Sequence, residues 1–157
     1  MDTQDLYQLA NSLSLQFWHK PLTIKVVWNT RLRSSAGRYI YSKAGPQRIE
    51  VSYQEYVDYG LAEVVNILKH ELCHFHLHQQ NKAFQDGSMV FKQECQRVGA
   101  LLTAKPRAVK YVQIFCSSCG QLLGYRQRIR KNLVSSCCGS SLMRGKEVLI
   151  TAQGEIT

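Results

Sequence analysis

The residues with the clearest chemical potential form the run His70-Glu71-Leu72-Cys73-His74. Residues four apart lie on one face of an α-helix, so His70 and His74 can both reach one metal ion. Glu71 lies beside that face, where its carboxylate can hold a zinc-bound water and take its proton. This H-E-x-x-H spacing is typical of the metal-binding helix of zinc metalloproteases. The alternative is a buried helix whose histidines are only hydrogen-bonded.

The residues around this run favour a helix that packs on one side and binds metal on the other. No proline or glycine interrupts residues 61–80, and apolar residues recur there at helical spacing. The stripe, which we expect to face away from the two histidines, consists of Leu61, Val64, Val65, Leu68, Leu72 and Phe75.

The rest of the first hundred residues predicts further helices and a small sheet. Residues 3–18 have the pattern of an amphipathic helix capped by Asp2 or Thr3. Strands are expected at residues 22–28, 39–41 and 49–52, with a turn at Gly45-Pro46 between the last two. A last helix is expected from the cap Ser88 to about Leu102, with Phe91, Cys95, Val98 and Leu102 on its inner face. The fold class is therefore α+β, with a small antiparallel sheet packed against helices.

The chain changes character after residue 104. Residues 104–107, Ala-Lys-Pro-Arg, are the best candidate for a linker between a domain at 1–104 and a module at 105–157. Short strands are expected in this module at 109–115, 122–129 and 147–151, separated by turns rich in Cys, Ser and Gly.

Four cysteines in the C-terminal module indicate a second zinc site. Cys116 and Cys119 form a C-x-x-C knuckle followed by Gly120, and Cys137 and Cys138 precede a second glycine. This separation is typical of a four-cysteine zinc ribbon, in which metal binding supplies much of the folding free energy. The second knuckle departs from the pattern, because serine occupies position 135, where the first cysteine is expected. Cys137 could supply the fourth thiolate, or the ribbon could lack its metal.

The C-terminal module is also the basic part of the chain. The net charge is +9, yet residues 1–104 carry 11 Lys and Arg against 9 Asp and Glu, whereas residues 105–157 carry 9 against 2. A basic patch favours a polyanion such as DNA or RNA, although it can also be a solvated face. The candidate contacts, of which the first three would share one face of the predicted strand, are Arg126, Arg128, Arg130 and Lys131.

Length and composition describe one folded core with a small appendage. The chain has 157 residues, 45% hydrophobic and 20% charged. No apolar run approaches the roughly 20 residues that span a bilayer, and the acidic, polar N-terminus is unlike a signal peptide. We therefore expect a cytoplasmic protein without membrane partners, in which the six cysteines are thiols or metal ligands. Cys73 and Cys95 have the pattern of core residues.

Over essentially its whole length, the chain resembles the SprT-like family, the bacterial relatives of the Spartan protease. The resemblance is carried by the segment Val27–Tyr39, which contains Asn29, Arg31, Arg33, Gly37 and Arg38, by His70–His78 with the following helix that starts near Phe91, and by the C-terminal zinc ribbon. The resemblance implies a zincin-like metalloprotease core, a catalytic zinc and a cytoplasmic location. Better-known relatives cleave proteins that are crosslinked to DNA. For the first segment, a purely structural role as a hairpin loop beside the site is the alternative.

Carried onto this sequence, the resemblance makes His70 and His74 zinc ligands and Glu71 the general base. Many members have a third histidine twelve residues after the second, and here that position is Asp86. A carboxylate can complete a catalytic zinc site, so Asp86 is one candidate for the third ligand and Glu94 is the other.

Two functions are consistent with the sequence. The first is a zinc-dependent metallopeptidase (HExxH, gluzincin or zincin-like) that acts on proteins associated with nucleic acid. The second is a zinc-containing nucleic-acid-binding module without catalysis, favoured by the absence of the third histidine. A zinc hydrolase of a small substrate is a third reading. The intact Glu71 favours an enzyme, because a structural zinc site does not need that carboxylate.

Overall fold

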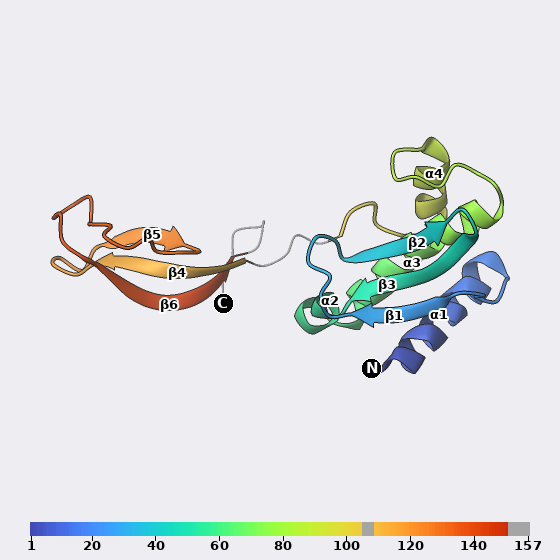
Figure 1. Cartoon of the computed structure of the whole chain (residues 1–157), viewed down its shortest axis with the longest axis horizontal. Coiled ribbons are helices and arrows are strands. Elements are labelled where there is room, and N and C mark those ends of the chain that lie inside the picture. Colours follow the sequence, from blue (N-terminus) through green and yellow to red (C-terminus); the bar gives the residue numbers. More distant parts are fainter. Residues whose placement is uncertain (105–108, 151–157) are drawn as a thin grey trace. The chain divides into compact units, whose positions relative to one another are not determined.

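The computed structural model describes residues 1–104 and 109–150 (Figure 1). The chain divides into two compact units, Met1–Ala104 and Lys105–Thr157, each with its own three-stranded sheet. The helices described all belong to the first unit, and together with the two sheets they give the expected mixed α+β class. Among the described residues, no helix has the length and apolar character that crossing a membrane requires.

The sheet of the first unit contains β1 (Lys25–Asn29), β2 (Gly37–Ser42) and β3 (Gly45–Ser52), in the order β1-β3-β2. β2 is antiparallel to β3, whereas β1 is parallel to β3. The predicted purely antiparallel sheet is therefore wrong, because the chain passes from β1 to β2 before β3 inserts between them. β2 forms one edge of the sheet.

Two predicted boundaries in this sheet are wrong by a few residues. The first strand begins at Lys25 rather than at position 22, although Leu22 and Ile24 are buried in the loop before it. The hairpin reverses before Gly45, since Ser42 pairs directly with Gly45. The predicted turn residues Gly45-Pro46 therefore start β3.

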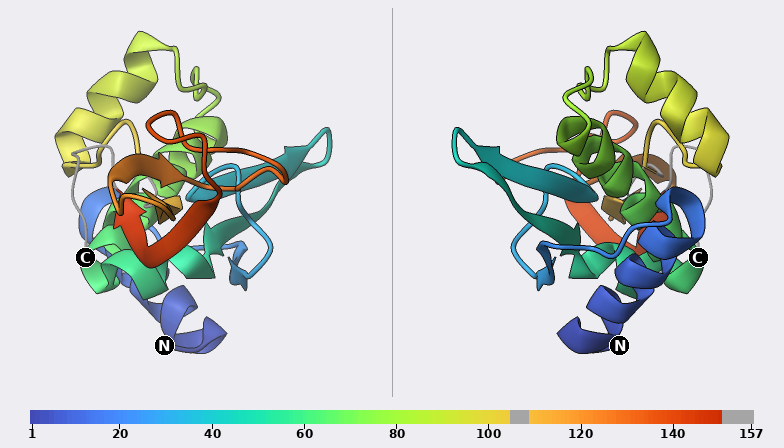
Figure 2. Two further views of the ribbon diagram at one scale, coloured as in Figure 1. Left: turned by 90° about the vertical axis from the view of Figure 1, so that its left-hand side faces the viewer. Right: turned by 90° about the vertical axis from the view of Figure 1, so that its right-hand side faces the viewer.

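Two helices pack against this sheet and enclose the core. α1 (Thr3–Trp18) has the predicted bounds, and the side chains of Asp2 and Asp5 form a capping box at its start. α3 (Leu61–Gln79) is the expected long helix. It lies behind the strands in the view of Figure 1, and Figure 2 shows the helices of this unit on one side of the β2–β3 hairpin. Most of the predicted apolar stripe of α3 is buried in the core, but Leu61 at the helix start is exposed.

The remaining helices differ from the prediction. α4 (Met89–Val98) starts at the expected cap Ser88 but ends four residues early, because Gly99 adopts a left-handed conformation with φ 67°. Leu102 thus lies outside the helix with 49% of its surface exposed, and its predicted place on the inner face is wrong. α2 (Tyr53–Tyr59) was not predicted; it follows β3 directly.

The second unit is an antiparallel sheet of β4 (Val109–Cys116), β5 (Leu122–Arg126) and β6 (Leu142–Ile150), in the order β5-β4-β6. β6 begins five residues before the predicted strand at 147–151. Position 151 and most of the predicted linker at 104–107 lie outside the described residues.

The prediction that three arginines share one strand face is wrong. The ladder between β4 and β5 ends at the pair Val112–Arg126, so the strand stops three residues before its predicted end. Arg128 and Arg130 therefore follow the strand in the irregular segment that also contains Lys131. All four basic side chains of this region, including Arg126, are exposed.

Candidate metal centres and active-site cleft

His70 and His74 lie on one face of α3, where they meet Asp86 from the loop before α4. The Nε2 atoms of the two histidines are 3.2 and 3.3 Å from the same Asp86 oxygen, Oδ1. One ligand atom from each of the three residues falls within 4.8 Å of the other two. The structure thus brings together the two predicted histidines and one of the two candidate carboxylates.

Backbone carbonyl groups fix the orientation of both imidazole rings. His70 Nδ1 is 3.0 Å from the carbonyl oxygen of Leu101, and His74 Nδ1 makes a short hydrogen bond to that of Phe84. A carbonyl only accepts, so each Nδ1 carries a proton, and Nε2 is the ring nitrogen left to bind a metal. Such an outer hydrogen bond orients metal-binding histidines in known sites.

This arrangement fits a divalent cation. Two imidazole Nε2 atoms converge on one carboxylate oxygen, and all three atoms are metal ligands when they carry no proton. Tetrahedral zinc with bonds of 2.0–2.1 Å sets its ligand atoms about 3.3 Å apart, which is the separation of Asp86 Oδ1 from both nitrogens. Asp86 itself is 77% exposed at its side chain, so this side of the site is open to solvent.

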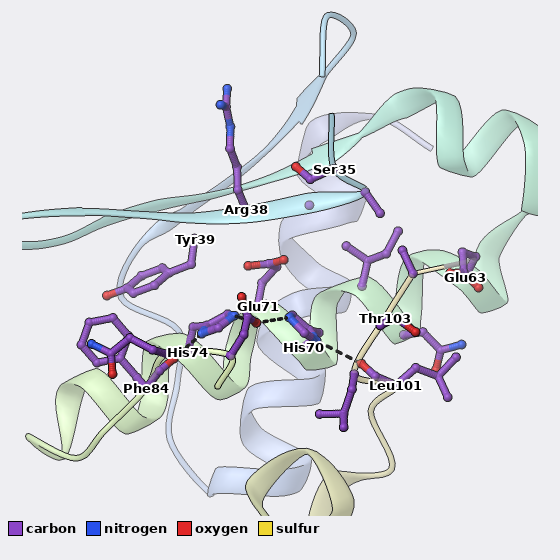
Figure 3. Close-up of a pocket in the computed structure, with 18 of the residues that line it drawn as sticks. Ser35, Arg38, Tyr39, Glu63, His70, Glu71, His74, Phe84, Leu101 and Thr103 are labelled. Atoms are coloured by element: carbon purple, nitrogen blue, oxygen red, sulfur yellow. Dashed lines mark hydrogen bonds and ion pairs between the residues drawn. The ribbon is translucent and has the colours of Figure 1, made fainter. Parts of the chain in front are cut away.

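Glu71 is buried between α3 and β2, with only 6% of its surface exposed. The strand can approach the helix this closely because residue 37 is glycine. A side chain at this position would overlap with Glu71 and Ile67. A Cβ atom on Gly37 would lie 3.0 Å from Glu71 Oε1 and 2.6 Å from Ile67 Cγ2. Figure 3 shows the Glu71 carboxylate below β2, next to the two histidines.

The surroundings of Glu71 favour its protonated form. Burial, with a smaller contribution from the negative charge of Asp86, raises the pKa of Glu71 to about 8, although the backbone N–H of Tyr39 donates to the carboxylate and opposes this shift. Burial also lowers the pKa of His74, which favours the neutral form of its ring. A carboxyl group whose pKa lies near neutrality can both accept and release a proton at physiological pH.

Glu94, the alternative third ligand, lies elsewhere. Its carboxylate accepts a hydrogen bond from Trp18 Nε1 at 2.7 Å and pairs with Arg97 at 2.7 Å. It is absent from the group of His70, His74 and Asp86. Within the described residues, Glu94 therefore joins α1 to α4 and does not face the metal-binding group.

The two other histidines of α3 are structural. His76 is buried, stacks on Trp18 with ring centroids 4.5 Å apart and contacts the Ser14 hydroxyl at 2.8 Å. Burial lowers the pKa of His76 to about 4. His78 stacks on Phe84 and contacts the Tyr39 hydroxyl through Nδ1.

The metal-binding group lies in a cleft of about 710 Å³. One wall is β2, a second is the loop with Phe84 and Asp86, and a third is the segment 101–104 after α4. The roles of Phe84 and Leu101 could not be predicted from the sequence, because these residues act through backbone carbonyls, which every residue has. Tyr41 and Tyr39 add aromatic rings at the Phe84 end of the cleft.

The arginines and the asparagine of the N-terminal segment have mainly structural partners. Asn29 and Arg38 both donate to Oε2 of Glu50, at 2.7 and 2.9 Å. Asn29 also accepts from the backbone N–H of Arg31. Arg33 extends toward Gln54. Of the five residues singled out in this segment, Gly37 and Arg38 line the cleft.

The four predicted cysteines of the second unit also converge. One sulfur atom from each of Cys116, Cys119, Cys137 and Cys138 lies within 4.8 Å of the others, and Cys119 Sγ is 3.6 Å from Cys137 Sγ. Tetrahedral zinc with bonds of 2.3 Å would separate its sulfur ligands by about 3.8 Å, so the cluster has a suitable size. All four thiols are free.

The structure explains the unusual second knuckle. The N–H of Gly120 donates to the carbonyl of Cys116, and the N–H of Gly139 donates in the same way to Ser135. Ser135 is therefore the backbone counterpart of Cys116, while Cys137 inside the turn supplies the missing sulfur. The Ser135 hydroxyl lies 3.2 Å from Cys116 Sγ, and hydrogen bonds donated to this sulfur by Ser135 and by backbone N–H groups of the knuckle lower the pKa of Cys116 to about 6.

Together, the fold and these two clusters define an α+β protein with an H-E-x-x-H helix and a four-cysteine module. The SprT-like family model matches residues 3–111. A "Protein SprT-like" from Staphylococcus saprophyticus is 35% identical over 150 residues, which cover 94% of this chain and 86% of that protein. One from Geobacillus kaustophilus is 34% identical over 88% of this chain and 94% of that protein. The chain belongs to the SprT-like family.

We predict that Gly37→Ala destabilises the first unit, because the added methyl group would clash with Ile67 and Glu71. Overpacking of this kind costs about 1–3 kcal/mol in the free energy of unfolding, measurable by urea denaturation. Gly87→Ala is the matched control, since a Cβ there would meet nothing within 4 Å. Equal stability of the two variants would contradict the close contact between β2 and α3.

Proposed function

We propose that this protein is a zinc-dependent metallopeptidase with a zincin-like core that acts on proteins associated with nucleic acid. The observation that carries the proposal is the convergence of two histidine Nε2 atoms and one carboxylate beside the buried Glu71. Membership of the SprT-like family agrees with it. Zinc would be held by His70, His74 and Asp86.

Bound zinc would supply Lewis acidity, which lowers the pKa of water toward 7 and polarises a carbonyl group. Glu71 then accepts the proton of the attacking water and passes it to the leaving amine. Its position under β2 holds the carboxyl group beside the two histidines and shields it from solvent. The carbonyls of Leu101 and Phe84 hold the histidine rings in place during this cycle.

The second unit would hold a structural zinc and bind nucleic acid. Its four sulfur atoms leave no position for substrate, as is typical of closed structural sites. The exposed side chains of Arg126, Arg128, Arg130 and Lys131 would contact phosphates of DNA or RNA.

A non-catalytic zinc protein that binds nucleic acid is the second candidate. The observation that favours it is Asp86, a mostly exposed aspartate in place of the third histidine. An additional negative charge on zinc weakens its Lewis acidity, so metal binding could persist without hydrolysis.

Zinc content separates the two sites. Elemental analysis of the purified wild type should give two zinc ions per chain, and His74→Ala and Cys119→Ser should each give one. His19→Ala, which removes an exposed histidine outside both clusters, should keep two. A zinc content in His74→Ala equal to that of the wild type would show that the helix site is wrongly assigned.

Glu71→Gln should keep its zinc and lose peptidase activity, because the amide preserves the shape and removes the base. A loss of at least 100-fold in the cleavage rate of casein with duplex DNA present is expected for a general base. Glu94→Gln makes the same chemical change away from the cluster and should remain active. Activity in Glu71→Gln would refute the mechanism, and an inactive wild type would favour the binding module.

The triple variant Arg126→Ala, Arg128→Ala, Arg130→Ala should bind DNA more weakly, and by the same factor for two unrelated duplexes. Phosphate contacts carry no sequence information, and losing three should reduce the salt slope by about 2–3. A charge-matched variant, Lys69→Ala, Lys82→Ala, Lys92→Ala, is the control for net charge. Fluorescence anisotropy at several salt concentrations measures both. Equal affinity and slope in the two variants would exclude the second unit as the contact.

A further inference from the structure

The small net charge of the first unit hides a strong separation of charge. Residues 19–53, which contain β1, β2 and β3, include seven basic residues and a single acidic residue, Glu50. The rest of residues 1–104 has four basic and eight acidic residues. The sheet region is therefore nearly as basic as the C-terminal module. The basic residues are Lys20, Lys25, Arg31, Arg33, Arg38, Lys43 and Arg48.

Several of these charges lie on the outer face of the sheet. Side chains alternate between faces along a strand, and Val26, Ile49 and Val51 are buried in the core against the helices. Their neighbours therefore point the other way. Lys25 pairs with Arg48 across the sheet, and Arg38 pairs with Glu50 in the adjacent row. We call Lys25, Arg38, Arg48 and Glu50 the outer sheet face. Within the described part of the first unit, no helix packs on it.

Glu50 holds the two arginines in place. Its two oxygens accept from the Nε atoms of Arg38 and Arg48, at 2.9 and 2.7 Å. The Glu50 side chain is only 7% exposed, whereas the two arginines are 49% and 44% exposed. These hydrogen bonds, with that from Asn29, lower the pKa of Glu50 to about 2 despite its burial, so it stays ionised.

The ion pairs with Glu50 leave the Nη ends of both guanidinium groups available to bind a ligand. Both ion pairs use Nε, and among the described residues the Nη atoms of Arg38 and Arg48 have no hydrogen-bond partner. A guanidinium fork that is already oriented loses little entropy when it binds, and its planar shape matches the oxygens of a phosphate. Two such forks and a lysine on one open face form a prepared surface for a row of phosphates.

We propose that the outer sheet face of the first unit binds the phosphate backbone of a nucleic acid, in addition to any contact made by the second unit. We infer a polyanion from charge complementarity, because this face has three cations and a single carboxylate, which is paired with two of them. The contacts are with phosphates, so binding is independent of base sequence.

The position of the outer sheet face also indicates a role in selecting the protein substrate. This role rests on the proposed function. Figure 3 shows Arg38 pointing from β2 away from Glu71 and His74, which lie on the other side of the strand. Gly37, Arg38 and Tyr39 of this strand all border the cleft, but the side chain of Arg38 extends to the outer side of the sheet. Nucleic acid on the outer face would therefore be separated from the cleft by the edge strand alone, so a protein attached to it is held close to the metal-binding group.

The test compares full-length variants that lose the same net charge at different places. The triple variant Arg38→Gln, Glu50→Gln, Arg48→Gln removes two positive charges and one negative charge, and it leaves no buried carboxylate without its partners. Lys82→Gln also lowers the net charge by one, but outside the sheet region. Binding of a fluorescein-labelled 20-base-pair duplex is measured by anisotropy at several salt concentrations, with circular dichroism to check folding.

We expect the triple variant to bind about tenfold more weakly than Lys82→Gln, with a salt slope smaller by about 1–2. Lys25→Gln, which breaks no ion pair, should show a smaller loss of affinity for the duplex. This variant replaces the triple variant in the test if the triple variant does not fold. Equal affinity and slope for Lys25→Gln and Lys82→Gln would overturn the proposal. The proposal would also be overturned if polyglutamate of matched charge competed as well as unlabelled duplex does. That result would indicate that the face binds an acidic protein. The measurement needs no peptidase activity, so it stands if the proposed enzyme function fails.

Discussion

The close contact between β2 and α3 at Gly37 determines the chemistry of the first unit. Because Gly37 has no side chain, the strand lies directly on the helix and covers Glu71. Burial under the strand, together with the nearby Asp86, gives this carboxyl group its raised pKa, and the Tyr39 N–H of the same strand orients it. A wider spacing would admit water around Glu71 and return its pKa toward the ordinary value. The position of one backbone thus sets the protonation of the candidate base.

The same strand separates two surfaces of opposite character. On its helix side lies a cleft with a carboxyl group, two histidines and an aspartate, and on its outer side lie the arginines that Glu50 holds. Glu50 and Glu71 are both buried carboxyl groups, yet their pKa values shift in opposite directions. Glu50 has three hydrogen-bond donors from side chains, whereas Glu71 has one backbone donor and a like charge nearby. Partners, rather than burial alone, decide which of the two remains ionised.

The parts of the fold that follow from side-chain pattern could be predicted from the sequence. The helical spacing of α1 and α3, the mixed α+β class and the grouping of His70 with His74 are examples. Features that depend on the path of the backbone could not be predicted. The early end of α4 at Gly99, the parallel pairing of β1 with β3 and the end of β5 at Arg126 belong to this group. Asp86 was identified by family resemblance, and only the structure distinguishes it from Glu94.

The hydrogen bond from His70 to Leu101 has a practical consequence for dividing the chain. α4 ends at Val98, so a fragment that stops after this last helix would seem to contain every element of the first unit. It would lack the carbonyl that orients one candidate ligand and the segment 101–104 that closes one side of the cleft. The histidine could then rotate or change tautomer while the fold remained intact. The smallest fragment with a correctly ordered metal-binding group therefore extends to residue 104, beyond the last regular element.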